Sequence, residues 1–533
     1  MSSFRVSIVR FFAVARGEAR IASAGAPQVA WRLLGLAGWT VAAILSGLLV
    51  GVVAVALPPM GLAGVVGIFG LALLWVLPDG LTPPDRFIRL NLLIVVFADI
   101  CIPTYYSLQV PGLPWISVRR VVTFVLIFMF SIAFSTSRSS RARIFSVVND
   151  NKLIFVGVFG FLITIVASIF TSITPFGSLN GLVSALLEWY VPFICAIYVL
   201  RDVKDVEMMI RFICWCAIGL MLVAAVEFVT GKSLYISIMP RFMYDQMIAN
   251  SDYARDVLTS GFHNRMGQVR VNGPYSVSLS FAEFQAMVAP FGAAFLLHGR
   301  NMFDRVFGIA VLLACLIAIY MSGSRGGYLS FLVGNFMFVM LFVVRSRLLQ
   351  PRSLIAPLFG ILGGAAFVVV AVAIAFVGRV HNVIFASGEG DSSNQARLLQ
   401  WTLAWPKIVA NPVTGHGFAA GGEIVGYRAS AAAPLSVDSF LLSLLVETGL
   451  PSVILYFGTS LVSTFVGVKQ YFLDQGRGGV LAGGLACSIT GFTAYRFFLS
   501  QRENQTLLFI LVGCVAIVRH LYVEERAART PAG

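Results

Sequence analysis

Apolar residues in this chain gather into long runs, and short polar stretches separate one run from the next. A run of about 20 apolar residues is long enough to cross the hydrocarbon layer of a bilayer as a helix. The pattern therefore predicts an all-α polytopic membrane protein with about 14 transmembrane helices. The predicted spans cover residues 33–57, 60–77, 88–108, 117–135, 153–173, 182–200, 209–229, 274–297, 306–321, 327–344, 354–377, 437–467, 479–498 and 505–520.

Lys and Arg are distributed unevenly between alternate loops. Roughly 24 of the 38 basic residues fall on the side that the N-terminal arm shares with loops 137–143, 201–211 and 345–352. Because cytoplasmic loops are enriched in Lys and Arg, both termini are predicted to be cytoplasmic. The first apolar run is too long for a secretory signal and lacks a small-residue cleavage site, so no cleavable signal peptide is expected.

The spans and loops together predict the organisation of the chain. Two long loops on the outer side interrupt the helices and are where function is expected. The predicted order is a basic cytoplasmic arm (1–32), an N-terminal transmembrane bundle (33–229), a first outer loop (230–273), central transmembrane helices (274–377), a second outer loop with a surface helix (378–436), C-terminal transmembrane helices (437–520) and a cytoplasmic tail (521–533).

Composition supports the membrane class and excludes others. Hydrophobic residues make up 58% of the 533 residues and charged residues 12%, with a mean hydropathy of +0.88, far above what a soluble core requires. The basic residues behind the net charge of +14 are scattered over short loops, which fits contact with anionic lipid headgroups and not a nucleic-acid-binding patch. All seven cysteines fall in predicted spans, so no external disulfide is expected.

The first outer loop ends in "RVNGPYSVSLSFAEF", which places Arg270 before a Gly-Pro turn. Proline is favoured in the first turn of a helix, so the turn is predicted to open the next span. Free backbone N–H groups at a helix N-terminus attract anions, and an adjacent arginine strengthens such a site. Arg270 is therefore a candidate anion-binding residue. The alternative is an interfacial arginine bonded to lipid phosphate or loop carbonyls.

Arg325 lies in "MSGSRGGYLS", between two apolar runs. Gly326 and Gly327 are predicted to start the next span, and small residues permit close approach of a ligand or of another helix. A guanidinium group presents a planar fork of donors that suits bidentate binding of phosphate. The alternative is a tight turn with an arginine that extends to the membrane surface.

The second outer loop contains "EGDSSNQARLLQWTLAWPKIVANPVTGHGFAAGGEIVGY". The segment 391–393 supplies N-cap residue types for a predicted surface helix over about 394–409, and "NPVTG" is expected to end it. Arg397 falls in the predicted first turn, where a cation opposes the helix dipole unless an acidic group or a bound anion is near. His416 lies in a glycine run that can cradle phosphate. A structural or pocket-lining role for His416 is favoured over that of a general base.

The second loop leads into "VDSFLLSLLVETGLPSVILYFG". Asp438 lies at the mouth of this span, either as an N-cap or as a base. Glu447 lies about 13 Å further along the helix at 1.5 Å per residue. Carboxylates in such positions are costly and usually face a partner or a cavity. "GLPS" at 449–452 predicts a break within the long apolar segment.

These blocks, in this order and on this side of the membrane, resemble the bacterial O-antigen ligase and polysaccharide polymerase superfamily. The resemblance rests on "RVNGP", "SGSRGG", "ARLLQWTLAWPKIVANPVTGHGFAAG" and "VDSFLLSLLVETGLPS", and covers about 265–460. It implies a metal-independent, C-type-like glycosyltransferase fold in the bacterial inner membrane, with its active site facing the periplasm. By motif position, Arg270, Arg325 and Arg397 would bind the diphosphate of a glycan linked to undecaprenyl diphosphate.

The resemblance also sets expectations about partners. The expected partners are the lipid-linked donor, a glycan acceptor, membrane lipids and other polysaccharide assembly proteins, with no nucleic acid. No cofactor is expected, and the outer loops carry no DxD-like metal pair.

One departure from the family pattern bears on the reaction. Ligases of this family carry a His-Asn pair where this chain has Val437 and Asp438. Asp438 is the nearest replacement for a base that would activate the acceptor hydroxyl, with His416 behind it. The departure favours a polymerase that makes exopolysaccharide, capsule or O-antigen. The alternatives are a ligase that transfers glycan to lipid A-core, a lipid-linked oligosaccharide flippase and a non-catalytic scaffold. A flippase should show related halves and buried midplane charges.

Overall fold

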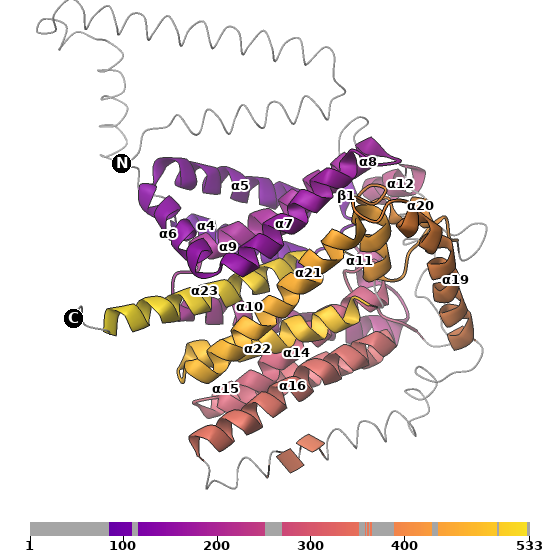
Figure 1. The fold of residues 1–533 in the computed structure, drawn as a ribbon. Helices are drawn as coiled ribbons and strands as arrows, with labels where there is room; N and C mark the ends of the chain where they lie inside the picture. Colours follow the sequence, from indigo (N-terminus) through magenta and orange to yellow (C-terminus); the bar gives the residue numbers. More distant parts are fainter. Residues whose placement is uncertain are drawn as a thin grey trace, which may run out of the picture. The chain divides into compact units, whose positions relative to one another are not determined.

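Helices account for nearly all of the structure (Figure 1). The computed structural model describes residues 85–108, 116–250, 269–350, 389–428, 435–497, 500 and 502–529, with isolated residues between 358 and 364. The helices are α4 (Asp85–Cys101), α5 (Val118–Thr136), α6 (Arg138–Asp150), α7 (Lys152–Ile169), α8 (Pro175–Ala185), the π-helical turn η2 (Leu186–Tyr190), α9 (Val191–Val199), α10 (Val203–Thr230), α11 (Leu234–Ser237), α12 (Arg241–Asn250), α14 (Ser278–His298), α15 (Met302–Ser322), α16 (Arg325–Leu349), α19 (Glu389–Ala410), α20 (Gly421–Val425), α21 (Phe440–Leu473), α22 (Arg477–Tyr495) and α23 (Gln505–Arg529). A short antiparallel pair, β1 (Ser107–Leu108) and β2 (Ile116–Ser117), precedes α5.

The sequence explains where the long helices begin and end. Within the described residues, nine helical segments are long and apolar enough to cross a membrane. Side chains at the N-cap accept a backbone N–H in several of them, as Asp202 does for α10 and Ser324 for α16. Gly231 and Gly323 end α10 and α15 in the left-handed conformation, with φ of 66° and 60°. In these helices, residues with capping side chains or with the left-handed conformation mark the ends of the apolar runs.

The predicted spans can be compared with these helices. Each span from 88–108 to 327–344 and from 437–467 to 505–520 overlaps a helix, although α4 ends at Cys101, before the predicted limit of that span. Residues 1–32, the spans 33–57 and 60–77, and most of 354–377 lie outside the described residues. The polytopic helical class is confirmed. The total of 14 spans, the C-type-like fold and the orientation in the membrane stay predictions.

Burial divides the described helices into central and peripheral ones. In α14 the most apolar window is 89% buried, and in α23 it is 78% buried, whereas in α5 and α16 it is 28% buried. α14 packs against α15, α16 and α22, while α23 packs against α9. The exposed apolar side chains of the peripheral helices, such as Phe128 and Leu153, suit contact with lipid. The loops at the ends of the central helices are therefore attached to the most buried part of the described bundle.

The loops that carry most of the candidate residues meet at one end of this bundle, which we call the loop end. Here α15 and α22 finish, while α14, α16, α21 and α23 begin. Figure 1 shows α8, α11, α12, α19 and α20 at this end, away from the C-terminus. Hydrogen bonds join these loops, including Ser276 N to Glu503 Oε1 at 2.9 Å and Ile173 N to the carbonyl of His416 at 3.0 Å.

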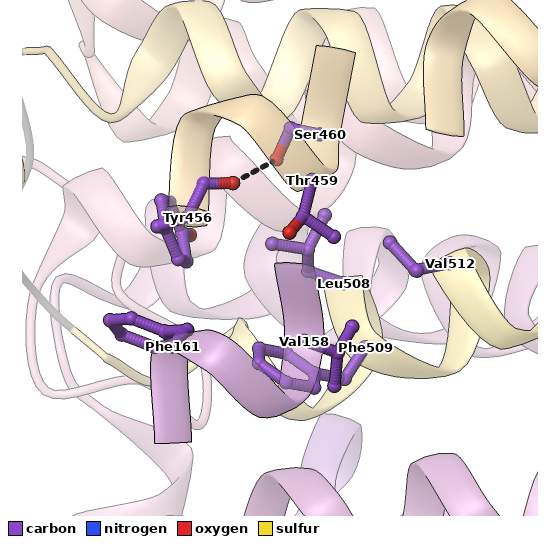
Figure 2. A pocket seen from close by; sticks show the side chains of 8 residues that line it. All are labelled: Val158, Phe161, Tyr456, Thr459, Ser460, Leu508, Phe509 and Val512. Carbon is purple, nitrogen blue, oxygen red and sulfur yellow. Dashed lines mark hydrogen bonds between the residues drawn. The ribbon is translucent and has the colours of Figure 1, made fainter. Parts of the chain in front are cut away.

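A small cavity of about 20 Å³ lies between α7, α21 and α23 (Figure 2). Its apolar lining comes mainly from Val158, Phe161, Leu508 and Phe509. The hydroxyl of Thr459, which also lines it, donates to a carbonyl of its own helix. A space of this size accommodates one water-sized molecule, and its lining offers few polar partners. We therefore regard it as a packing gap and not as a substrate site.

Candidate functional site

Arg270 lies against the turn that precedes Arg325. Its Nε donates to the carbonyl of Ser322 at 3.0 Å, and the next residue's N–H donates to the carbonyl of Met321 at 3.3 Å. A Cβ added at Gly323 would lie 3.6 Å from Arg270 Nε. Two arginines from distant parts of the sequence thus belong to one local structure at the loop end.

The prediction that the Gly-Pro turn opens the next span is wrong. Gly273 has a φ of 58°, and its N–H donates to Glu227 Oε2 at 3.1 Å, so the turn is held by the end of α10. α14 begins only at Ser278. Arg270 therefore lies eight residues before the helix and not beside its N-terminus. Burial raises the pKa of Tyr275, in the same turn, well above its usual range.

Arg325 is the first residue of α16, one residue before the Gly-Gly pair that was predicted to start this span. Ser324 caps the helix and also hydrogen bonds the hydroxyl of Tyr495 at 2.6 Å. A Cβ at Gly326 would lie 2.6 Å from the Tyr495 ring, and one at Gly327 would lie 2.8 Å from Ala282 Cβ. Of the two roles predicted for these glycines, close approach of another helix is the one that the structure supports.

α19 extends from Glu389 to Ala410 and ends at "NPVTG", as predicted. It begins about five residues earlier than expected, so residues 391–393 lie inside the helix and do not cap it. Arg397 then falls in the third turn, and the predicted conflict with the helix dipole does not arise. Arg397 is half-buried, one turn before Gln400, whose Oε1 accepts the backbone N–H of Asp438 at 2.9 Å.

His416 is held by its backbone and by its ring. Its N–H donates to the carbonyl of Val446 at 2.9 Å, and its Nε2 lies 2.9 Å from the carbonyl of Lys407, near the end of α19. A carbonyl only accepts hydrogen bonds, so Nε2 carries the proton and Nδ1 holds the lone pair of the neutral ring. The structural role is therefore evident. Any action of His416 as a base would use Nδ1.

The glycine run around His416 binds a carboxylate of this same chain. Glu447, which is 2% exposed, accepts the N–H of Ala419 and that of Gly421, each at 3.1 Å. Its remaining contacts are with the hydroxyl of Ser443 at 2.7 Å and with Arg502. Two of the N–H groups in this run are therefore occupied by the carboxylate of Glu447, and that of Phe418 donates to the hydroxyl of Ser168.

Arg502 is a site residue that the sequence reasoning did not identify. Its guanidinium forms an ion pair with Glu447 and lies 4.2 Å from the centroid of the Phe418 ring. It comes from the short segment between α22 and α23, outside the motifs quoted for the family. Glu447 could have indicated such a residue from the sequence, because a carboxylate in an apolar segment needs a cationic or N–H partner.

Asp438 does not cap α21, so that alternative is wrong. Ser439 is the N-cap, and its hydroxyl accepts the N–H of Leu442 at 3.4 Å. Asp438 is half-buried, and the peptide group that precedes it is hydrogen bonded at both of its polar atoms: Gln400 accepts the N–H of Asp438, and the hydroxyl of Ser500 donates to the carbonyl of Val437. No hydrogen bond or ion pair to its carboxylate is found among the described residues.

A continuous series of contacts links the arginines to Asp438. Tyr495 contacts the turn before Arg325, and the carbonyl of Arg496 accepts the N–H of Phe440 at 3.2 Å, two residues beyond Asp438. Behind this contact, Arg496 and Glu283 form a fully buried ion pair at 2.9 Å. The elements that carry Arg270, Arg325, Arg397, His416 and Asp438 therefore lie at the same end and are connected through neighbouring residues.

Grouped metal ligands are not found in this region. In the part of the chain that the structure describes, no three His, Cys, Asp or Glu side chains are arranged to hold a metal ion. The carboxylates of Glu447 and Glu283 are each paired with an arginine.

Comparison with known proteins bears directly on this region. No match was found among curated proteins. Residues 309–457 match the family model described as O-antigen ligase, a segment that contains Arg325, Arg397, His416 and Asp438 but not Arg270 or Arg502. This match supports the resemblance of the chain to the O-antigen ligase and polysaccharide polymerase superfamily over the segment that it covers.

Proposed function

We propose that the protein is a polysaccharide polymerase. It joins oligosaccharide repeat units linked to undecaprenyl diphosphate, on the periplasmic face of the bacterial inner membrane. The observation that carries the proposal is the family match over 309–457, together with the meeting of its polar residues at the loop end of the bundle. The end of the bundle opposite the loop end carries basic segments such as 138–143, which suits a cytoplasmic position.

Arg270, Arg325 and Arg397 are proposed to bind the diphosphate of the donor. When the glycosidic bond breaks, negative charge develops on this leaving group. Guanidinium groups that are already in position stabilise that charge without rearrangement, which typically changes rates by about 10²–10³ for each donor group. Arg270 and the residues before Arg325 are fixed by hydrogen bonds to one turn, so their positions are set before the substrate arrives.

The acceptor hydroxyl must lose a proton as it attacks the sugar. Asp438 is proposed as the base, because the peptide group that precedes it is held by two hydrogen bonds and the residue is half-buried just before the start of α21. His416 is second in order, acting through Nδ1. Asp438→Asn is expected to lower kcat by about 10²-fold or more. Near-normal turnover of that variant in purified protein would exclude Asp438 as the base.

An O-antigen ligase is the second candidate, since the matching family model carries that description. A ligase transfers a finished glycan to lipid A-core, whereas a polymerase adds one lipid-linked unit to another. The presence of Val437 and Asp438 where family ligases carry a His-Asn pair favours the polymerase.

Deletion of the gene in its host tests the reaction class. Loss of a polymerase leaves single repeat units on the carrier lipid, exposed to the periplasm, whereas loss of a ligase leaves polymer on the carrier. Loss of a flippase instead traps single units on the cytoplasmic side. Mass spectrometry of lipid extracts, with and without periplasmic glycosidase treatment, separates these results.

Complementation with variants tests the diphosphate site. Arg325→Ala and Arg397→Ala are each expected to lower the yield of polymer by about 10²-fold. Arg241→Ala, at the start of α12, is a control that changes an exposed arginine at the same end. Wild-type chain length and yield from both Arg325→Ala and Arg397→Ala would refute the role of these residues.

A further inference from the structure

Glu447 and Arg502 form an ion pair, which we call the latch, that joins three segments distant in sequence. Glu447 lies on α21, Arg502 follows α22, and the N–H groups of Ala419 and Gly421 that reach Glu447 belong to the segment after α19. The Glu447 side chain is 3% exposed and that of Arg502 is 27% exposed. One carboxylate therefore holds together the three segments that surround the candidate site.

The segment that follows α19 connects the latch to Arg397. The residues from 411 to 421 follow α19, and their backbone is fixed on α21 by the bonds from His416 to Val446 and from Gly417 to Glu447, each 2.9 Å long. The His416 ring in turn bonds the carbonyl of Lys407 near the end of α19. A change in the position of this segment would therefore move α19 and the residues that it carries.

The segment between α22 and α23, which carries Arg502, connects the latch to Asp438. Arg502 lies two residues after Ser500, whose hydroxyl bonds the carbonyl of Val437, next to Asp438. The guanidinium of Arg502 also stacks on Phe418, which is fully buried. Arg502 thus contacts the 411–421 segment and belongs to the same short loop that holds the start of α21.

The backbone beside the latch is strained at Ala419. Ala419 has a φ of 68°, and it is the non-glycine residue with positive φ among those that the structure describes. This conformation is unfavourable for a residue with a Cβ and persists only where the surroundings enforce it. Its N–H points to Glu447 Oε2. Residues held in such conformations cluster at functional sites.

We propose that Glu447 and Arg502 are positioning residues for the glycosyl transfer, and that the latch sets the place of Arg397 relative to Asp438. This inference rests on the proposed function. The latch touches no reacting atom. It fixes the distance between the group that binds the leaving diphosphate and the group that takes the acceptor proton, and a displacement of about 1 Å in such a pair lowers rates by about 10²-fold.

Kinetics on purified protein test the proposal. The substrate is the single-unit carrier lipid extracted from the deletion strain, and the variants are Glu447→Gln, Arg502→Ala and Arg502→Lys. We expect Glu447→Gln and Arg502→Ala to lower kcat by about 10–100-fold with KM changed less than about threefold. Arg502→Lys, which keeps the charge, should recover a substantial part of kcat. The control is Glu207→Gln, which breaks an ion pair with Arg477 at the opposite end and should keep wild-type kcat.

A second measurement does not depend on the reaction. Trypsin cleavage after Lys407 and Arg428, which flank the latched segment, should be faster in Glu447→Gln and Arg502→Ala than in wild type and in Glu207→Gln. The latch is refuted if cleavage is unchanged, or if kcat per folded molecule is unchanged while only the yield of folded protein falls. If wild-type protein does not join the extracted single-unit lipids into polymer, the proposed function is refuted. The trypsin result still decides, in that case, whether the latch holds the 411–421 segment.

Discussion

Replacement of Gly449 by Ala is the most direct test of how the loop end is built. Gly449 interrupts α21 with φ 79° and ψ 179°, a conformation that favours glycine strongly. A Cβ here would lie 2.4 Å from the carbonyl oxygen of Val413 and 2.7 Å from that of Pro412. Both are backbone atoms of the 411–421 segment, so neither can move aside as a flexible side chain can.

The magnitude follows from these contacts. A non-glycine residue in this conformation costs about 1–3 kcal/mol. Displacement of the segment also breaks the 2.8 Å bond from Leu450 N to the carbonyl of Pro412, which contributes about 1 kcal/mol. The sum of about 2–4 kcal/mol corresponds to a change of about 30- to 1000-fold in the population of the docked segment, at about 1.4 kcal/mol for each factor of ten.

Trypsin cleavage after Lys407 and Arg428 measures that population, because cleavage follows the open form when opening and closing are fast. We expect faster cleavage of Gly449→Ala at equal protein concentration, with a lower kcat. Gly458→Ala is the matched control, since it lies on the same helix and a Cβ there meets no atom within 4 Å. Wild-type protection in Gly449→Ala would refute the docking of this segment on α21.

Other substitutions test the packing and the caps around the site. Gly157→Ala places a Cβ 2.1 Å from Thr459 Oγ1, where α7 meets α21, and overpacking of about 1–3 kcal/mol should lower the melting temperature in detergent; an unchanged value would contradict this close contact. Glu283→Ala removes the carboxylate of the fully buried pair with Arg496, at a cost of about 3–5 kcal/mol, and should give little folded protein on size-exclusion chromatography; a normal yield would show that the pair does not support α14 and α22. Ser439→Ala removes the N-cap of α21, at a cost of about 1 kcal/mol, and should lower the melting temperature. The kcat per folded molecule should stay near wild type. A large fall in kcat would show that the cap, and not Asp438 alone, supports catalysis.

The break within α21 was predictable because it depends on local chemistry. "GLPS" combines a glycine with a proline, and the helix is interrupted at Gly449, as predicted. The length of α21 also shows that not all of it is needed to cross a membrane. Its 34 residues would extend about 51 Å at 1.5 Å per residue, whereas a bilayer core is about 30 Å thick. Leu450–Leu473 alone extends about 36 Å. The residues before Gly449 are therefore available to build the loop end.

Predictions that depended on contacts with residues distant in sequence were less successful. Asp438 has the right residue type and place for an N-cap, yet Ser439 forms the cap. The peptide group between Val437 and Asp438 is bonded instead by Gln400 and Ser500. The glycine run had the composition of an anion cradle, but its anion is the carboxylate of Glu447. Pro274 suits a helix start, but Glu227 holds the turn before it, and α14 begins at Ser278.

The sequence by itself determined the class of the protein, the approximate place of most described helices, the break at Gly449 and the motifs that resemble the O-antigen ligase superfamily. These depend on hydropathy, on residue spacing and on backbone preferences, all of which act over a few residues. The tertiary structure alone decided that Arg502 pairs with Glu447, that Tyr495 fills the space beside Gly326, and that Arg270 joins the turn before Arg325. A charged or polar side chain takes the partner that folding brings within hydrogen-bonding distance, and distance along the chain does not specify which partner that is.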